Sequence, residues 1–174
     1  GEPYWLTQEL QNQAKQQGHA TTALSCYQAL GTDFLSHLAG SFSVVIVDAQ
    51  TQSLFAAVDK LGRYPLYYRE SATAVQVANQ VSALQTLDRT NLDISNQGIY
   101  NYIYFHMIPA PQTVYVGVHK LQAAHALRAD RSGVSVTRYW TPTFSEAPAR
   151  TMSDYGAELK QVLANSVRRA LHSN

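Results

Sequence analysis

The side chains that could carry out chemistry are few and scattered. Cys26 is the only thiol in the 174 residues, and a thiol becomes a nucleophile only beside a group that removes its proton. It falls inside a predicted helix with no terminal amine next to it, so we interpret Cys26 as a small core residue. The histidines stand at positions 19, 37, 106, 119, 125 and 172, and none has metal-ligand spacing to another His, Cys or carboxylate. We therefore predict no catalytic residue and no metal site in this chain.

The composition argues against several classes of protein. Charged residues make up 14% of the chain and the net charge is +1, so there is no electrostatic case for binding nucleic acid or an anionic membrane. The longest apolar run, residues 43–47, is far too short to span a bilayer. Gly40, Gly62 and Gly117 are isolated and form no phosphate-binding loop, so we expect no cofactor in the chain itself. A single cysteine and no visible signal peptide favour the cytoplasm.

Helical periodicity predicts two helices before the first long strand. The first covers residues 7–16 and ends at Gly18, because glycine readily takes the conformation that closes a helix. Thr21 or Thr22 would cap the second, which stops at Gly31. Its expected buried stripe consists of Ala23, Leu24, Tyr27 and Leu30. A short helical turn opened by Asp33 follows, carrying Phe34, Leu35 and Leu38.

Strands are predicted after Gly40. Residues 41–47 are partly apolar on both alternate faces, so we expect a central strand covered on both sides. Residues 53–58 pair with it across a polar turn, and residues 66–69 and 73–78 form a second hairpin. We expect burial between the sheets and the helices of Phe42, Val44, Ile46, Leu54, Ala56 and Val58.

The second half of the chain alternates again between helix and strand. Helices are predicted at residues 80–87 and 96–106, the latter capped by Ser95. One stripe of that helix holds Ile99, Tyr102, Ile103 and His106. Strands are predicted at residues 113–121, 126–130 and 134–140. Helices packed against such sheets indicate the α+β class.

The end of the sequence has a different pattern. Residues 141–152 contain Pro142 and Pro148 and are predicted to be a linker. Ser153 would cap a last helix over residues 153–174. Its apolar stripe is wide enough to need a buried partner, and consists of Tyr155, Leu159, Val162, Leu163, Val167, Ala170 and Leu171.

Three segments together carry a resemblance to a known family. They are Gly40-Ser-Phe-Ser-Val-Val-Ile-Val-Asp48, then Asp59-Lys-Leu-Gly-Arg-Tyr-Pro-Leu-Tyr-Tyr68, then the stretch from Pro111 to Trp140 that includes Gly117-Val-His-Lys-Leu121. In this order and spacing they resemble the N-terminal glutaminase domain of asparagine synthetase-type proteins, a class II glutamine amidotransferase domain. The resemblance covers nearly the whole chain.

The resemblance implies an Ntn-hydrolase-like fold, a four-layer sandwich with two antiparallel sheets between helices. Within the second segment we expect structural roles rather than catalysis. Asp59 would accept backbone N–H bonds in its loop, Gly62 would take a positive φ, and Pro65 would fix the start of the next strand.

In that family the nucleophile is a first-residue cysteine whose own α-amino group is the base, which a terminal amine with a pKa of roughly 7.7–8.0 can be. This chain begins with Gly1. The family's Asn-Gly-Glu-x-Tyr-Asn segment holds the substrate glutamine, and Gly1, Glu2 and Tyr4 align with its Gly, Glu and Tyr. Gly1 and Glu2 are therefore the expected remnant of the substrate-binding site, and we expect the domain to be N-terminally incomplete.

A further departure concerns the group that binds the ammonium of glutamine. The family uses a Gly-x-Asp segment, which aligns here with Gly18-His19-Ala20. Ala20 cannot pair with a buried cation, and desolvating an ammonium without a partner costs several kcal/mol. We therefore expect that this chain does not hydrolyse glutamine.

The resemblance also implies what the parent protein does. Residues 1–140 would be a partial amidotransferase-like domain, and residues 153–174 would lead into an ATP-dependent synthetase domain that needs ATP and Mg2+. The parent would form an amide from an aspartate-like acid, with glutamine supplying nitrogen. Its partners would be its own synthetase domain and these small molecules, and a homo-oligomer stays open. The alternative is a non-catalytic scaffold domain, as in relatives that resemble β-lactam synthetases or peptide cyclases.

Overall fold

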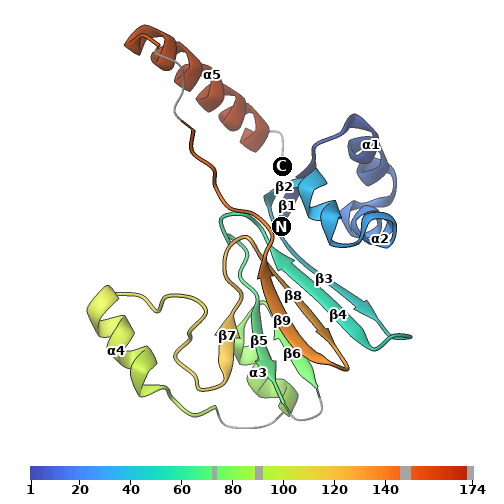
Figure 1. The fold of residues 1–174 in the computed structure, drawn as a ribbon, viewed down its shortest axis with the longest axis vertical. Coiled ribbons are helices and arrows are strands. Elements are labelled where there is room, and N and C mark those ends of the chain that lie inside the picture. Colours follow the sequence, from blue (N-terminus) through green and yellow to red (C-terminus); the bar gives the residue numbers. More distant parts are fainter. Residues whose placement is uncertain (72–73, 89–91, 146–149, 172–174) are drawn as a thin grey trace. The chain divides into compact units, whose positions relative to one another are not determined.

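The structure is a computed structural model that describes residues 1–71, 74–88, 92–145 and 150–171 (Figure 1). The chain divides into two compact units, residues 1–141 and residues 142–174.

Among its described residues the first unit contains three antiparallel sheets together with helices, which confirms the α+β class. The sheets have the strand orders β1-β2, β3-β4-β8-β9 and β6-β5-β7. The elements of the first unit are β1 (Glu2–Trp5), α1 (Gln8–Gln17), α2 (His19–Leu30), η1 (Gly31–His37), β2 (Leu38–Ser41), β3 (Ser43–Asp48), β4 (Ser53–Val58), β5 (Tyr67–Glu70), β6 (Val75–Ala78), α3 (Val81–Asp88), α4 (Asn96–Phe105), β7 (Val118–Lys120), β8 (His125–Asp130) and β9 (Gly133–Arg138). The hairpins β3–β4, β5–β6 and β8–β9 form where the sequence predicts them.

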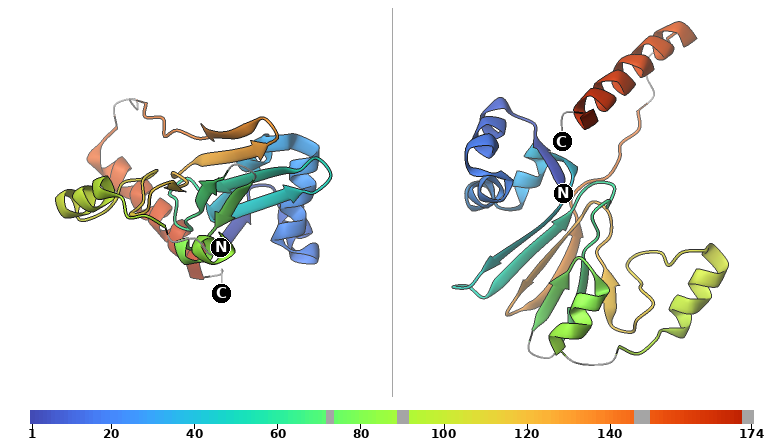
Figure 2. Two further views of the ribbon diagram at one scale, coloured as in Figure 1. Left: turned by 90° about the horizontal axis from the view of Figure 1, so that it is seen from below. Right: turned by 180° about the vertical axis from the view of Figure 1, so that it is seen from behind.

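The four-stranded sheet lies between two layers because its central strand is apolar on both faces. Phe55 and Ala57 of β4 point into a core shared with α1, α2 and η1. Ala56 and Val58 point the other way, into a core shared with the three-stranded sheet. A third core, around Leu84 of α3, covers the far face of that second sheet. Figure 2 shows the two sheets side by side, with α1 and α2 on one side and α3 on the other.

The prediction that residues 41–47 form a central strand covered on both sides is wrong. The segment is divided at Phe42, whose backbone amide bonds to the carboxylate of Asp59 instead of joining a ladder. Its second half, β3, is the edge strand of the four-stranded sheet. Val45 and Val47 are 43% and 67% exposed, whereas Val44 is partly buried against the helices. Phe42, Ala56 and Val58 are buried as predicted, while Ile46 and Leu54 are only partly buried.

The first two helices follow the sequence closely, with one correction. Thr7 caps α1, and Gly18 ends this helix, as predicted, at φ 86°. The second helix begins at His19 directly after Gly18, so neither Thr21 nor Thr22 caps it. The hydroxyl of Thr22 donates instead to the carbonyl of Gly18 within the first turn. The buried positions of α2 are Thr22, Ala23 and Cys26, while Leu24 and Leu30 are 43% and 46% exposed.

The predicted strand 113–121 is mostly irregular, and only β7 within it is a strand. The cause is the buried hydroxyl of Thr113, which accepts a bond from the amide of Tyr115 and donates a 2.8 Å bond to the carbonyl of Val118. These bonds close a turn. In a strand, the same backbone groups would instead pair with a neighbouring strand.

The helix at residues 96–106 forms as α4, with Ser95 as the predicted cap. The expected apolar stripe, however, faces outward. Ile99, Tyr102 and Ile103 are 42%, 60% and 69% exposed, His106 is also exposed, and the helix buries Gly98 and Asn101 instead.

The second unit contains one helix, α5 (Met152–Leu171), among its described residues. Thr151 and Asp154 exchange hydrogen bonds at its start, so Thr151 is the cap rather than the predicted Ser153. No residue of α5 is buried in this structure. In the part of the chain that the structure describes, no helix is both long and apolar enough to cross a membrane.

Candidate functional site

The two residues predicted to bind substrate lie at the start of a short two-stranded ribbon. Glu2 pairs with Ser41, and Trp5, at the other end of β1, pairs with Leu38. Trp5 is only 1% exposed and anchors β1 in the core beneath α1 and α2. Gly1 and Glu2 are both exposed, so β1 presents its first residues at the surface while its last residue is fixed.

Close packing of backbone against backbone explains the glycines at this end. A Cβ on Gly1 would lie 2.7 Å from the carbonyl oxygen of Ser41 and 2.9 Å from the Cα of Phe42. A Cβ on Gly40 would lie 2.5 Å from the carbonyl oxygen of Glu2, and Gly40 also has φ 86°. No side chain fits at either position without moving the strands.

Asp59 joins this end of the ribbon to the loop after β4. Its carboxylate accepts three backbone N–H bonds, from Phe42 at 3.1 Å, Leu61 at 2.8 Å and Arg63 at 3.1 Å. The side chain is 2% exposed, and its own carbonyl accepts the amide of Ala124. The predicted structural role of Asp59 as an acceptor of backbone hydrogen bonds is confirmed, and all its described partners are structural.

The glycine of the same motif behaves as predicted. Gly62 has φ 65° and donates its amide to the carbonyl of Asp59. A Cβ there would lie 3.2 Å from the Cβ of Ala123. The motif is therefore a compact loop. Its end is held at the start of the second sheet, because the backbone amide of Leu121 donates to the carbonyl of Leu66.

The predicted ammonium-binding position lies on the first turn of α2. Ala20 is exposed, and its neighbour His19 accepts a 3.2 Å bond at Nδ1 from the indole N–H of Trp5. This bond ties α2 to the end of β1 opposite Glu2. The three strand steps from Glu2 to Trp5 cover about 10 Å. The predicted substrate-binding pair and the Ala20 position are thus attached to the two ends of one strand.

Cys26 lies in the core, as predicted. It is 6% exposed and packs in the same cluster as Trp5 and Phe34. Burial raises the pKa of its thiol, so the thiolate needed for nucleophilic attack is disfavoured. Among the described residues, no group of three or more His, Cys, Asp and Glu side chains is placed to hold a metal ion.

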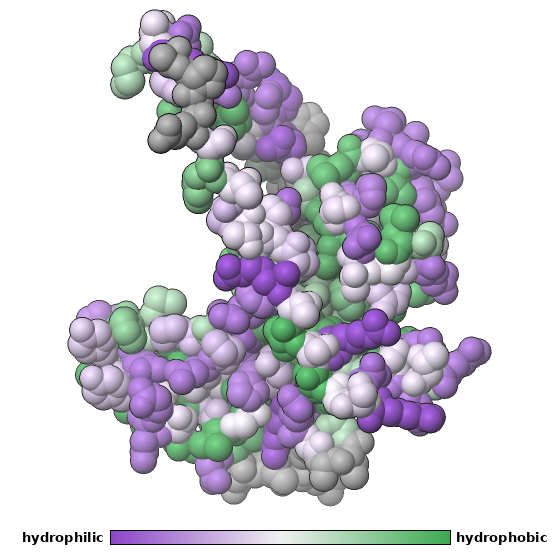
Figure 3. All heavy atoms as spheres, in the orientation of Figure 1, coloured by the Kyte–Doolittle hydropathy of each residue, from purple (hydrophilic) through white to green (hydrophobic). Residues whose placement is uncertain are grey.

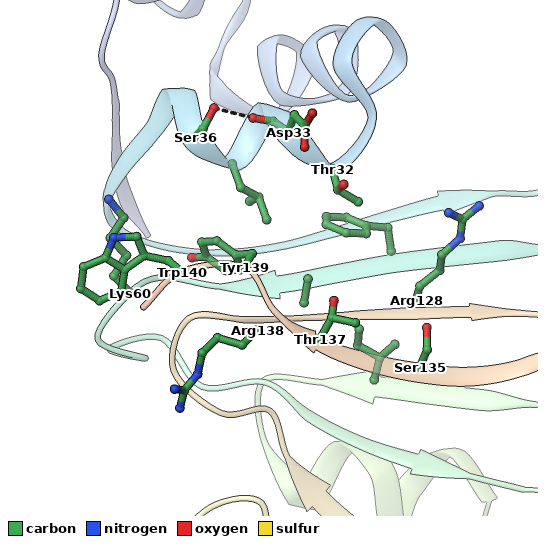
Figure 4. Close-up of a pocket in the computed structure, with 14 residues that line it drawn as sticks. Thr32, Asp33, Ser36, Lys60, Arg128, Ser135, Thr137, Arg138, Tyr139 and Trp140 are labelled. Atoms are coloured by element: carbon green, nitrogen blue, oxygen red, sulfur yellow. Dashed lines mark hydrogen bonds between the residues drawn. The ribbon is translucent and has the colours of Figure 1, made fainter. Parts of the chain in front are cut away.

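Sequence reasoning missed a cavity of about 650 Å³ between η1 and the strands β4, β8 and β9. Thr32, Asp33 and Ser36 line it from η1, facing hydroxyls and an arginine on the sheet: Arg128, Ser135 and Thr137 (Figure 4). At one end, the ammonium of Lys60 lies 5.2 Å from the ring centre of Trp140. The side chain of Arg138 is turned away from η1. Neither Gly1, Glu2 nor Ala20 lines this cavity.

The alternation along the last hairpin is the signal that could have indicated this cavity. On β9, Ser135 and Thr137 are two residues apart, Tyr139 continues this spacing just after the strand, and Arg128 pairs directly with Ser135. An alternation of polar side chains predicts a sheet face that is not fully covered. Tyr139 also lines the cavity, and its hydroxyl donates a 2.7 Å bond to the carbonyl of Val58.

Residues 5–140, more than three quarters of the chain, match the glutamine amidotransferase domain family. The chain belongs to this family. This amidotransferase-family chain is similar to a provisionally named glutamine-hydrolyzing asparagine synthetase of Mycobacterium tuberculosis, with 29% identity over 166 residues, 90% of this chain and 25% of the relative. Asparagine synthetase 3 of Bacillus subtilis, also named glutamine-hydrolyzing, is 24% identical over 176 residues, 97% of this chain and 28% of that relative.

A shorter similarity links the amidotransferase-family chain to the amidase chry2 of Gibberella zeae, 35% identical over 60 residues, which are 34% of this chain and 9% of the amidase. The resemblance to asparagine synthetase-type proteins, inferred from the three sequence segments, is confirmed. The chain spans about a quarter of the length of the asparagine synthetases that it matches.

Proposed function

We propose that this chain is the amidotransferase-type part of an asparagine synthetase-like, ATP-dependent amide-forming ligase, and that residues 1–174 do not hydrolyse glutamine themselves. The family match over residues 5–140 and the similarity to asparagine synthetases support the first statement. The layers of helices, sheet, sheet and helix support the interpretation of the fold as an Ntn-hydrolase-like sandwich.

One observation carries the second statement: the only thiol of the chain is buried. Hydrolysis of an amide by this class of domain needs a thiolate within reach of a base and of the substrate carbonyl. Cys26, on the buried face of α2, is 6% exposed and has a pKa raised by burial. No nucleophile of the required kind is therefore accessible within residues 1–174.

Ala20 supports the same conclusion from the substrate's side. A carboxylate at this position would pair with the ammonium of glutamine. The methyl group of Ala20 cannot replace the hydrogen bonds to water that this cation would lose on binding. Gly1 and Glu2 are proposed as the remnant of the glutamine-binding segment. The carboxylate of Glu2 is exposed, and the position of its backbone is set by pairing with Ser41.

The rest of the reaction belongs to the parent polypeptide. We assign ATP and Mg2+ to a synthetase region outside residues 1–174, and none of the described residues is assigned to hold them. In such a ligase ATP activates the carboxyl group of the acid, and ammonia or an amine then forms the amide. This chain is then the nitrogen-supplying domain of the ligase, or a domain derived from one.

A second candidate is a scaffold domain that has lost glutaminase activity and only supports the synthetase region, as in a β-lactam synthetase-like or peptide-cyclase-like protein. Ala20 is the observation that favours it, because this position lies within the chain and departs from the family pattern.

The nitrogen source separates the two candidates. The full-length polypeptide is incubated with ATP, Mg2+ and aspartate, with either glutamine or ammonium chloride, and amide, glutamate and pyrophosphate are measured. Amide formation from both nitrogen sources supports an amidotransferase. ATP-dependent amide formation with ammonium or an amine, but never with glutamine, supports the scaffold. Absence of ATP consumption across a panel of carboxylic acids and amines contradicts both.

A further inference from the structure

Helix α4 has its polar and apolar faces reversed relative to an ordinary surface helix. The face that touches the rest of the unit is formed by Gly98 and Asn101, its two buried residues. A Cβ on Gly98 would lie 2.7 Å from the carbonyl oxygen of Thr113. The side-chain amide of Asn101 donates a hydrogen bond to the side-chain oxygen of Gln112. A glycine contact and a polar contact therefore attach this helix.

The outward faces of α4 are apolar and aromatic. Tyr100 and Tyr104 stack with ring centres 6.2 Å apart, and Tyr104 meets Phe105 edge to face. Both tyrosines are more than 60% exposed. We call the following set the α4 surface: Ile94, Ile99, Tyr100, Tyr102, Ile103, Tyr104, Phe105, Met107 and Val116, each of them at least 42% exposed. Figures 1 and 2 show α4 projecting from the sheets, and in Figure 3 this part of the surface is a mixture of pale purple and green residues.

The charge pattern of the segment fits a permanent contact. From Ile94 to Val118 there is no Asp, Glu, Lys or Arg. The centres of protein interfaces are depleted in charged residues and enriched in Tyr, Phe and Met. Obligate interfaces are the most apolar, whereas contacts that form and dissociate rely more on charge. The α4 surface therefore has the chemistry of a face that is covered throughout the life of the protein.

The length of the relatives indicates what covers it. The chain corresponds to about a quarter of each asparagine synthetase that it matches, so most of such a polypeptide lies outside this domain. Resting on the function proposed above, we propose that the α4 surface is the docking site for the synthetase region of the same polypeptide. A segment linked in the same chain has a high effective concentration at this surface, so an uncharged contact suffices to hold it.

Hydrogen–deuterium exchange of α4 tests this proposal. The amides of residues 96–105 are followed in the 174-residue chain and in the full-length polypeptide. We expect them to exchange at least about tenfold more slowly in the full-length polypeptide, because docking must open before they exchange. Equal exchange in the two proteins overturns the proposal.

Two variants sharpen the test. Ile103→Asp places a charge on the α4 surface, and Leu24→Asp makes the same kind of change on the exposed side of α2. Both residues are solvent-exposed in this chain, at 69% and 43%, so both variants should fold, which circular dichroism of the 174-residue chain checks. In the full-length polypeptide only Ile103→Asp should restore fast exchange in α4. No effect of Ile103→Asp there contradicts docking at this surface.

Other occupants give different results. A second copy would appear as a concentration-dependent dimer of the 174-residue chain in light scattering, abolished by Ile103→Asp, and this outcome overturns the proposal. Failure of the proposed function is seen separately, since exchange needs no turnover. Protection of α4 without ATP-dependent amide formation leaves docking intact and rejects the ligase activity, whereas activity without protection rejects the docking site alone.

Discussion

The backbone amide of Phe42 donates a 3.1 Å hydrogen bond to Oδ2 of Asp59, seventeen residues further along the chain. This bond divides the predicted strand 41–47 into β2 and β3, and connects the Gly1–Glu2 end of β1 to the loop after β4. The candidate substrate-binding segment is therefore supported by a buried carboxylate that accepts backbone hydrogen bonds.

Asp59→Asn should destabilise the first unit by about 2–4 kcal/mol, because an amide keeps one acceptor oxygen and turns an N–H₂ group toward buried N–H donors. Fluorescence of Trp5, which is 1% exposed, follows unfolding in urea. Asp48→Asn is the matched control. Asp48 also accepts two backbone N–H bonds, but in an exposed turn, so its replacement should leave the urea midpoint nearly unchanged. Equal effects of the two changes would refute a special role for Asp59.

Gly40→Ala and Gly18→Ala separate backbone strain from close packing. Both glycines have φ 86°, but a Cβ on Gly18 meets nothing within 4 Å, whereas one on Gly40 lies 2.5 Å from the carbonyl oxygen of Glu2. Gly18→Ala should cost about 1–3 kcal/mol for the positive-φ backbone conformation alone. Gly40→Ala should cost at least about 1 kcal/mol more, because the β1–β2 ribbon must separate. Thermal denaturation gives both values, and a smaller loss for Gly40→Ala would show that the ribbon yields freely.

The Tyr139 hydroxyl gives a prediction about alkaline pH. Burial raises its pKa, and the nearby charge of Asp59 raises the pKa further. In the unfolded chain a tyrosine ionises near pH ~10, so above that pH the unfolded state loses this proton before the folded state does. Folding stability is therefore complete below about pH 10 and decreases as pH rises beyond it.

Tyr139→Phe should flatten this decrease and cost about 1 kcal/mol at neutral pH, because the 2.7 Å bond to the carbonyl of Val58 is lost. Urea denaturation at pH 8, 10 and 11 measures both effects. Tyr155→Phe, at a 42% exposed position of α5, is the control and should follow the parent chain. An unchanged slope in Tyr139→Phe would mean that its hydroxyl is not shielded from water.

Local patterns in the sequence predicted most helices and strands. Which of their faces are buried depends on contacts between residues distant in sequence, and this could not be predicted. The strand at residues 53–58 follows from an apolar run after a polar turn, and the end of α1 at Gly18 follows from a glycine. The edge position of β3 could not be predicted, because Val45 and Val47 have the same residue types whether a layer covers them or not. The apolar stripe of α4 could be recognised from the sequence, but its exposure could not, since periodicity shows that a face is apolar and not what it touches.

The candidate site likewise has one part that the local sequence indicates and one part that it does not. The motif from Asp59 to Tyr68 indicated the family because its residues make local bonds that leave a fixed spacing. The cavity beneath η1 was missed because the residues that line it, such as Asp33 of η1 and Arg128 of β8, are distant in sequence and are brought to one cavity only by the fold.

Removing α5 should leave the first unit intact. None of its residues is buried, and Leu159, Val162 and Leu163 are each at least 55% exposed. A chain ending at Thr141 should therefore melt within about 2 °C of the 174-residue chain, since a loss of 1 kcal/mol shifts the midpoint of a domain of this size by roughly 2–4 °C. Scanning calorimetry decides this. A larger fall would assign α5 to the core of the first unit and contradict the proposal that it leads into the synthetase region.

The most direct test of the central claim is glutamate release from glutamine by residues 1–174, measured beside a Cys26→Ser variant. The account predicts no glutamate above the buffer blank for either protein, because Cys26 is buried and Ala20 offers the substrate ammonium no partner. Release at about 1 s⁻¹, a rate ordinary for enzymes, that disappears in Cys26→Ser would contradict it.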